Sequence, residues 1–211
     1  MQTPGPTRRP FVVVAAIATV VLLATAGCGS SPQPQAPASL AKATTLDSRQ
    51  GGFSLSYPAS FVKVEPDVSA QPGLIYQVYL ADPTGVVSGG NALDVLGVSV
   101  HRISKTAAAG DLAKREGEFR AIAMQLIGAP VGLRLVAPFE ITELGGRPAL
   151  KVEYVYTVKG IDVATVAYLV PSGKRVYWVT GQASRKTWTT TGRAIGGAIS
   201  TITFTAPAGS G

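Results

Sequence analysis

The alternation of apolar and polar positions predicts that the folded part of the chain begins with β-strands. In GGFSLSYPASF, Phe53, Leu55 and Tyr57 alternate with serines, and Pro58 is expected to end this half-buried strand. GLIYQVYLADPTG predicts a second strand, followed by a turn in which Asp82 accepts backbone N–H groups. These two segments are expected to open a sheet.

The segment NALDVLGVSVHRI predicts a third strand that is apolar over nearly all of one face. Its residues divide between two faces, with Leu93, Val95, Gly97 and Ser99 on one and Asp94, Leu96, Val98 and Val100 on the other. A strand with so few polar positions needs cover on both sides, so we expect it in the centre of the sheet.

A period near 3.6 residues predicts a helix in DLAKREGEFRAIAMQLIGAP. Its apolar stripe would pack on the sheet and consists of Leu112, Phe119, Ile122, Ala123 and Leu126. Asp111 is expected to cap the first turn, because a carboxylate accepts the free N–H groups there. Gly128 and Pro130 are expected to end the helix.

The second half of the chain returns to β-structure and closes with a helix. GLRLVAPFEITELGG predicts one strand, or two short ones divided near Pro138. ALKVEYVYTV, DVATVAYLV and RVYWVTGQA are joined by short connections, KGI and PSGK, which predicts an antiparallel meander. The apolar spacing after Trp188 predicts a C-terminal helix on the sheet, with a short extended piece at Thr201–Phe204. The fold class is therefore α+β, a central, mostly antiparallel sheet flanked by two main helices.

The first 27 residues have the pattern of a signal peptide. MQTPGPTRRP is basic, and the uncharged run from Phe11 to Gly27 is shorter than the roughly 20 apolar residues of a membrane span. A retained signal anchor is the alternative. Export by the Sec route is expected, and because TRRPFVV is similar to the twin-arginine motif, that route is the alternative.

Cys28, the single cysteine, follows Thr25-Ala26-Gly27 in a pattern that resembles the bacterial lipobox. The resemblance implies cleavage between Gly27 and Cys28 and a diacylglyceryl group on the thiol. Two acyl chains suffice for stable anchoring, so we expect the protein on the extracytoplasmic face of the cell membrane. An intermolecular disulfide is the alternative for the thiol.

The composition beyond Cys28 predicts how the remaining chain is organised. Residues 28–44 are rich in proline, serine, glutamine and alanine, which predicts a disordered tether after the lipidated cysteine. A single α+β domain is expected over residues 45–205 and a disordered tail over residues 206–211.

The basic residues are unevenly distributed. The chain has 19 Lys and Arg against 12 Asp and Glu, and residues 147–211 are strongly basic. One interpretation is a patch for anionic headgroups, cell-wall polymer or an acidic partner, formed by Lys174, Arg175, Trp178, Arg185, Lys186 and Arg193. The alternative is solvated cations around a buried aromatic core. Nucleic acid is not expected as a partner of an exported protein.

Five tyrosines on predicted strands are candidates for a ligand pocket between sheet and helix: Tyr76, Tyr79, Tyr154, Tyr156 and Tyr168. Aromatic residues on strands are usually core residues, which is the alternative. His101, the single histidine, would have to be the base of any Ser-His-Asp triad, and the sequence has no Gly-x-Ser-x-Gly segment. A solvent-exposed histidine at a strand end is the simpler interpretation, so we expect no catalytic residues, no metal and no cofactor.

Three segments resemble PsbP/Mog1-like domains. GGFSLSYPASF is similar to the opening strand of that family, GGRPALKVEYVY to its turn-and-strand segment, and TWTTTGRAIGGAISTITF to its terminal helix and final strand. The resemblance covers residues 51–204, and the family includes actinobacterial lipoproteins of the LpqN/LpqT type. It implies an α/β sandwich that binds proteins or small ligands, with no catalytic residues shared across the family.

These features predict a membrane-anchored envelope lipoprotein that is a non-enzymatic binding or accessory module for an envelope protein partner. A carrier that holds a lipid, glycolipid or other small amphiphile in a pocket is the alternative, and a hydrolase using His101 is a third hypothesis. The sequence does not indicate an oligomeric state.

The anchor is tested by replacing its attachment point. We expect Cys28→Ala to abolish metabolic labelling with a radioactive fatty acid and to block cleavage, because no thiol remains to be acylated. Replacing both Arg8 and Arg9 by lysine should stop export only if the twin-arginine route is used. Unchanged labelling of Cys28→Ala would overturn the lipidation hypothesis.

Overall fold

The computed structural model describes residues 42–108 and 110–205. The predicted signal peptide, Gly27, Cys28 and the predicted tail over residues 206–211 lie outside the described residues. So does the predicted tether up to residue 41. Among the described residues, no helix is long and apolar enough to cross a membrane.

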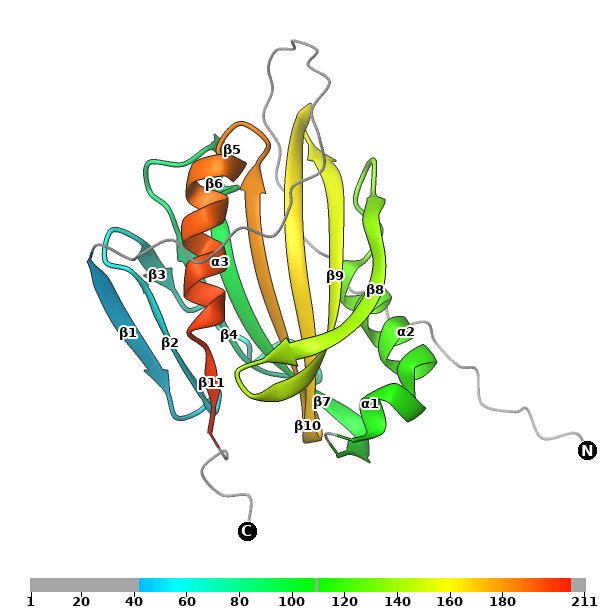
Figure 1. Ribbon diagram of the computed structural model, residues 1–211. Coiled ribbons are helices and arrows are strands. Elements are labelled where there is room, and N and C mark those ends of the chain that lie inside the picture. The colour runs from blue at the N-terminus through cyan, green and yellow to red at the C-terminus, as the bar shows by residue number, and fades with distance from the viewer. Residues whose placement is uncertain (1–41, 109, 206–211) are drawn as a thin grey trace, which may run out of the picture.

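An antiparallel sheet forms the centre of the molecule (Figure 1). Its strands follow the order β3 (Val62–Val64), β4 (Leu74–Ala81), β7 (Val95–Ala107), β10 (Ile161–Ser184), β9 (Arg147–Val158) and β8 (Arg134–Leu144). The predicted α+β class is confirmed, and so is the central position of the strand in NALDVLGVSVHRI, which is β7. Strand β8 is a single strand with shifts of register on both sides of Pro138.

Strand β10 reverses direction in its middle. Its first half, Ile161–Leu169, pairs with β9, and its second half, Arg175–Gln182, pairs with β7. Gly173 lies between the halves with a positive φ of 60°, and at the far end Arg185 N–H donates to the carbonyl of Asp162 at 2.9 Å. The strands predicted on either side of PSGK are the two arms of β10, and the predicted meander is confirmed (Figure 1).

A smaller sheet joins the two ends of the described chain. Strand β2 (Phe53–Pro58) lies between β1 (Ala43–Ser48) and β11 (Thr203–Phe204). Strand β2 and the extended piece at the end were predicted. Strand β1, strand β3 and β5 (Val87–Ser88) were not predicted, because they are short or mostly polar. The segment predicted as the third strand is divided into β6 (Asn91–Ala92), which forms a hairpin with β5, and β7.

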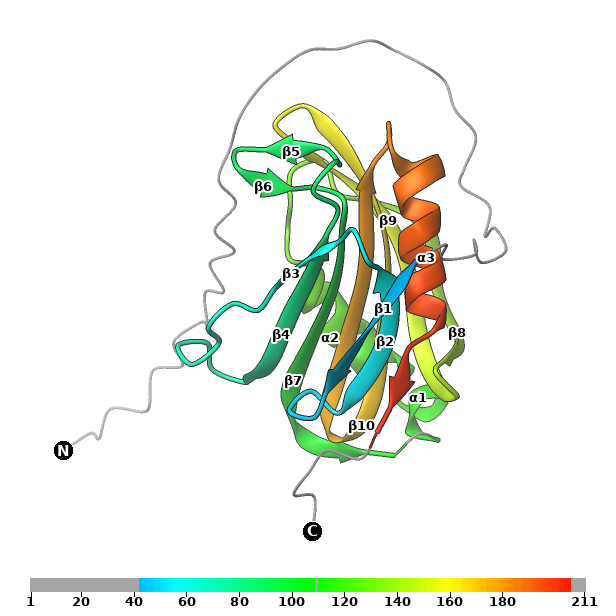
Figure 2. The same ribbon diagram turned by 90° about the vertical axis from the view of Figure 1, so that its left-hand side faces the viewer.

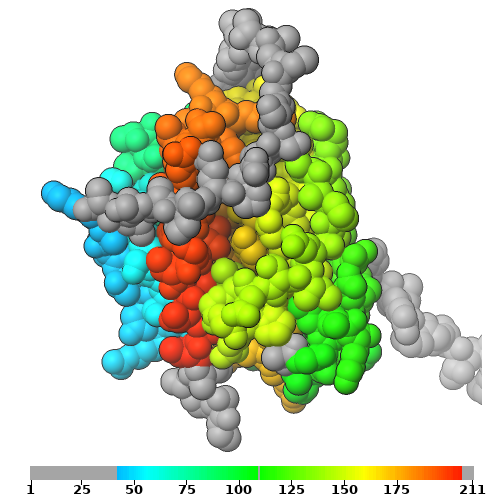
Figure 3. All heavy atoms as spheres, viewed as in Figure 1, coloured from blue at the N-terminus to red at the C-terminus, as the bar shows by residue number. Residues whose placement is uncertain are grey.

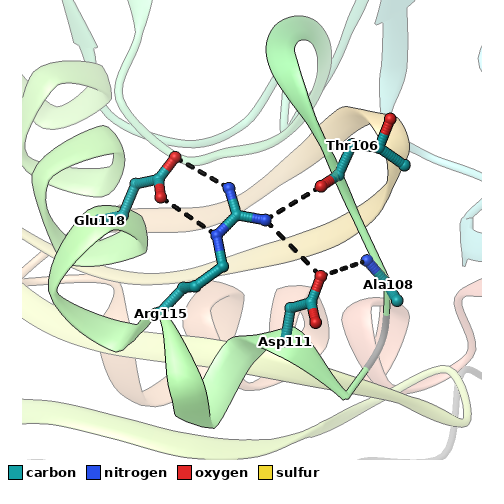
Figure 4. Close-up of polar contacts among 5 residues, drawn as sticks. All are labelled: Thr106, Ala108, Asp111, Arg115 and Glu118. Atoms are coloured by element: carbon teal, nitrogen blue, oxygen red, sulfur yellow. Dashed lines mark hydrogen bonds and ion pairs between the residues drawn. The ribbon is translucent and has the colours of Figure 1, made fainter.

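The helix predicted from residue 111 is interrupted. Helix α1 (Asp111–Lys114) and helix α2 (Glu116–Ile127) meet at Arg115, whose φ of −120° is not helical. The Arg115 guanidinium donates to Glu118 at 2.9 Å and to the carbonyl of Thr106 at 3.0 Å (Figure 4). These contacts fasten the start of α2 to the end of β7. Gly128, with a φ of 72°, ends α2 as predicted.

The predicted role of Asp111 as a helix cap is wrong. No side chain caps the first turn of α1. The Asp111 carboxylate accepts the N–H of Ala108, before the helix, at 2.9 Å and lies 3.6 Å from Arg115 (Figure 4). The carboxylate therefore binds the backbone of the segment before α1 and not the free N–H groups of its first turn.

Two aspartates hold the connection between β4 and β7. Asp82 accepts the N–H of Thr84 at 2.9 Å, which confirms the predicted turn. Asp94 is fully buried, and its carboxylate accepts the N–H of Val86 at 3.1 Å and that of Ser184 at 2.8 Å. The buried carboxyl group therefore has two backbone donors, one in the connection between β4 and β7 and one at the end of β10.

The core has two layers, one on each face of the main sheet. On one face, helix α3 (Arg193–Ser200), preceded by the π-helical turn η1 (Trp188–Gly192), and the smaller sheet bury Phe53, Leu55, Ile195 and Ile199. Helices α1 and α2 cover part of the other face through Leu112 and Phe119. Figure 2 shows α3 and β1–β2 on the side of the sheet away from α2, and Figure 3 shows residues of α3 at the surface of the molecule.

The packing of α2 gives a stability prediction. Phe119 is fully buried beneath α2, whereas Met124 on the same helix is 38 % exposed. We expect Phe119→Ala to lower the free energy of unfolding by about 3–5 kcal/mol, because it leaves a cavity. Met124→Ala, the control, should change it by less than about 1 kcal/mol. Urea unfolding followed by circular dichroism measures both, and equal losses would contradict the assigned packing.

Candidate functional site

One part of the main sheet is left without a helical cover, and we call it the open face. It consists of residues on three neighbouring strands whose side chains share one side of the sheet: Val62 and Val64 on β3, Gln77 and Tyr79 on β4, and Ser99 and His101 on β7. Trp178, directly opposite Ser99 on β10, is instead part of the core under α2. The covered and open parts of this face therefore meet at β7.

The open face combines exposed apolar groups with hydrogen-bonding groups. Val62 is 51 % exposed, Val64 is 48 % exposed and Tyr79 is 37 % exposed. Val64 and Tyr79 are directly opposite each other, so they form one continuous apolar strip. Gln77 donates to the Tyr79 hydroxyl at 2.7 Å, which orients the ring beside the strip.

Gly97 leaves room for the Tyr79 ring beside β7. A Cβ atom at this position would lie 2.7 Å from Thr180 Oγ1 and 3.3 Å from the Tyr79 ring. The space that a side chain would fill is therefore occupied by its cross-strand neighbours. The absence of a side chain at Gly97 sets the shape of the open face.

His101 and Ser99 are hydrogen-bonded on the open face. The Ser99 Oγ and His101 Nε2 atoms are 2.8 Å apart. His101 is half-buried, so its interpretation as a solvent-exposed residue is wrong, and burial lowers its pKa from the ordinary value of 6.5. Sequence reasoning missed this pair, although a spacing of two on a strand places both side chains on the same face.

The pair does not have the surroundings of a catalytic Ser-His dyad. Ser99 is 6 % exposed, and its strand is paired with Gln77 on one side and Trp178 on the other. An oxyanion site needs free N–H groups, which a strand paired along both edges does not offer. Among residues 42–108 and 110–205, no carboxylate is hydrogen-bonded to the His101 ring.

The six residues of the predicted basic patch do not come together. Lys174 and Arg175 lie at the turn of β10, whereas Arg185 follows its other end. Arg185 lies ten positions after Arg175 along the extended strand, a span of roughly 33 Å. Lys186 and Arg193 lie beyond Arg185, at the start of the C-terminal helical segment, and Trp178 is 7 % exposed in the core. Trp178 therefore belongs to the buried aromatic core that was the alternative.

At the turn of β10, a groove of about 340 Å³ is lined by Ile75, Arg102, Lys174 and Arg175. We call it the basic groove. Arg102 is directly opposite Arg175 on the neighbouring strand. Sequence reasoning missed Arg102, because its partner is 73 positions away and only the strand register brings the two together.

The five tyrosines proposed as a pocket lie in different parts of the structure. Tyr76 and Tyr168 pack in the core layer beneath α3, whereas Tyr154 and Tyr156 pack in the layer beneath α2, and Tyr79 lies on the open face. The Tyr76 hydroxyl donates to Glu65 at 2.5 Å, and burial with this bond raises the pKa of Tyr76 to about 12. Burial likewise raises the pKa of Tyr156 to about 12, and its hydroxyl donates to Gln182. The five rings do not line a common cavity.

The described part of the chain contains no group of three or more His, Cys, Asp or Glu residues that could hold a metal ion. No protein-family model matches the sequence, and no curated protein matches it.

Solved structures show what fold the chain has. The solution structure of cyanobacterial PsbP (CyanoP) from Synechocystis sp. PCC 6803 aligns with a TM-score of 0.51 and 17% identity, over 82% of this chain and 98% of that chain. At this identity the likeness shows the fold alone. The chain therefore has a PsbP-like α+β fold, as the sequence resemblance implied.

Two further structures align less closely. The crystal structure of LpqN, involved in cell envelope biogenesis of Mycobacterium tuberculosis, gives a TM-score of 0.49 and 17% identity over 78% of this chain and 91% of that chain. A structure from Bacteroides thetaiotaomicron gives 0.49 and 10% identity over 77% of this chain, and the aligned part is 48% of that longer chain.

His101 gives a pH prediction. Because burial lowers its pKa in the folded state, the unfolded chain binds the proton more readily, and folding favours the neutral ring. The stability that depends on neutral His101 is present above its unfolded pKa and is lost as the pH falls through the folded pKa. We therefore expect the urea unfolding midpoint to fall more for the wild type than for His101→Gln between about pH 7.5 and about pH 5, a range that brackets the ordinary histidine pKa.

Glutamine keeps a hydrogen-bonding group at this position but takes up no proton in this pH range, so His101→Gln is the matched control for protonation of the ring. Parallel pH profiles for the two proteins would show that His101 does not carry the effect.

Proposed function

We propose that the protein is an envelope lipoprotein, anchored through Cys28 on the extracytoplasmic face of the membrane, whose domain binds an envelope protein partner without catalysing a reaction. The sequence pattern around Cys28 supports the anchor. The observation that carries the binding role is the open face, where Val62, Val64 and Tyr79 form an exposed apolar strip.

The composition of the open face favours a protein partner. Contact of contiguous apolar groups with water is unfavourable, so the free energy falls when another surface covers them. Gln77 lies beside the strip on β4, and Ser99 and His101 continue the open face with polar groups on β7. An apolar centre with a polar rim is the usual composition of a protein–protein interface.

Two other functions are less well supported. A carrier needs a lined cavity, and the tyrosines expected to form it are divided between two core layers and the open face. A hydrolase needs a serine in reach of both a base and free N–H donors, and Ser99 lies within a strand paired on both sides. Ser99→Ala with unchanged ester hydrolysis would support the non-enzymatic role.

Site-specific photo-crosslinking tests the partner surface. A photoreactive phenylalanine analogue is placed at Val64 on the open face and, as a control, at Val131, which is 78 % exposed elsewhere. We expect a discrete adduct from position 64 in intact cells, an envelope protein by mass spectrometry, and none from position 131. Val62→Asp should reduce the adduct at least fivefold, because a charge in the apolar centre must be desolvated on binding.

The same experiment separates anchoring from binding. If Cys28→Ala abolishes the adduct in cells but purified protein still binds the identified partner, the two parts of the proposal both stand. The binding role fails if positions 64 and 131 give the same adducts, or if Val62→Asp has no effect while its thermal unfolding matches the wild type.

A further inference from the structure

We propose that the basic groove at the turn of β10 is a binding site for a phosphate-class oxyanion, either free phosphate or the phosphate of a lipid headgroup. This inference does not rest on the proposed protein-binding role. The groove lies next to Arg102 and Arg175, whose side of the sheet is opposite to the open face because neighbouring residues on a strand alternate in direction.

The strand register forces two like charges together. Arg102 on β7 and Arg175 on β10 are direct partners in the antiparallel ladder. Side chains at such positions have Cβ atoms about 4.5–5.5 Å apart, and like charges there are destabilising. Lys174, which follows the turn at Gly173, adds a third cation to the lining of the groove.

The backbone makes this arrangement rigid. Strand β4 shifts register between Leu74 and Tyr76, which leaves Ile75 as an additional residue beside β7. The N–H of Arg102 donates to the carbonyl of Gly73 at 2.7 Å, and the Gln50 side chain donates to the carbonyl of Ile75 at 3.4 Å. The floor of the groove is thus held by hydrogen bonds that do not use the cationic groups.

The cations of the groove have no counter-charge within residues 42–108 and 110–205. Other basic side chains are paired: Arg115 with Glu118, Arg120 with Glu116 and Lys151 with Glu153. By contrast, the side chains of Arg102, Lys174 and Arg175 make no ion pair and no hydrogen bond to any described residue.

The guanidinium of Arg175 is also partly removed from water. Its Nη1 atom is buried and has no hydrogen-bond partner, while the residue contributes to the lining of the groove. A buried donor without a partner costs free energy, and a charged one costs more. An anion in the groove would offset the repulsion between Arg102 and Arg175.

The chemistry of the three side chains favours a phosphate group. A guanidinium is planar and donates two parallel hydrogen bonds to oxygens of a phosphate or carboxylate, and an ammonium acts as a point charge. Two guanidinium groups and one ammonium match an oxyanion with three or more oxygens better than a carboxylate with two. The groove volume of about 340 Å³ also leaves room for the group to which the phosphate is bonded.

Calorimetric titration of the full chain in nonionic detergent tests the site. Sodium phosphate and dihexanoyl phosphatidylglycerol are titrated separately at constant ionic strength, with sodium chloride and dihexanoyl phosphatidylcholine as controls. We expect one saturable site for phosphate or for phosphatidylglycerol. Arg102→Gln and Arg175→Gln should each weaken binding at least tenfold, because each removes a charge-assisted contact.

Arg185→Gln is the matched control, because it removes the same charge at the opposite end of β10. It should change the dissociation constant by less than about twofold, because the charge it removes is distant from the groove and screened by salt. Without ligand, Arg102→Gln should unfold at the same or a higher urea concentration than the wild type, since the repulsion with Arg175 is relieved. A normal unfolding midpoint also shows that weaker binding is not a folding defect.

The outcomes distinguish the source of the anion. Saturable binding of inorganic phosphate alone supports a free-phosphate site, and binding of phosphatidylglycerol but not phosphatidylcholine supports a headgroup site. The proposal is overturned if neither ligand shows saturable binding, or if Arg185→Gln weakens binding as much as Arg175→Gln does.

Discussion

The register between β7 and the second half of β10 is the constraint on which the other features depend. It places Ser99 opposite Trp178, Gly97 opposite Thr180 and Arg102 opposite Arg175. A shift by one residue would turn every side chain of the strand to the other face. Burial on both sides fixes the register, because Val98 and Val179 must enter the same core layer. The close charges of the basic groove are therefore a consequence of how the core packs.

Unequal cover of the sheet gives the molecule two distinct surfaces. The smaller sheet and α3 cover the face that carries the apolar residues of β4, whereas α1 and α2 cover only the part of the other face formed by β9, β10 and the end of β7. The open face is what α2 leaves exposed, with an apolar strip on β3 and β4. The basic groove lies at the end of the sheet, where β10 turns. We propose a protein partner for the open face and an anion for the basic groove.

The strongly apolar, closely spaced strands were predictable from the sequence, as β7 and the meander of β9 and β10 show. Features that depend on contacts between residues distant in sequence could not be predicted from the local pattern of apolar and polar residues. Strand β1 is mostly polar and forms because β2 offers a partner edge. The helix is interrupted at Arg115, whose guanidinium contacts the carbonyl of Thr106 at the end of β7. Lys174 and Arg175 were named from composition, but Arg102 joins them only through pairing. The predicted patch was divided because extended strand separates residues that are close in sequence.

The smaller sheet determines how a mechanical load would enter the domain. Strands β1 and β11 pair with the two edges of β2, and Ala43 lies opposite Pro58 whereas Phe204 lies opposite Phe53. The two ends of the described chain are therefore held at opposite ends of β2. Tension applied ahead of Ala43 would reach β1 first and would have to separate it from β2. The main sheet is hydrogen-bonded separately and carries both proposed binding surfaces. A domain pulled from its N-terminal side would therefore yield at β1 before the binding surfaces were distorted.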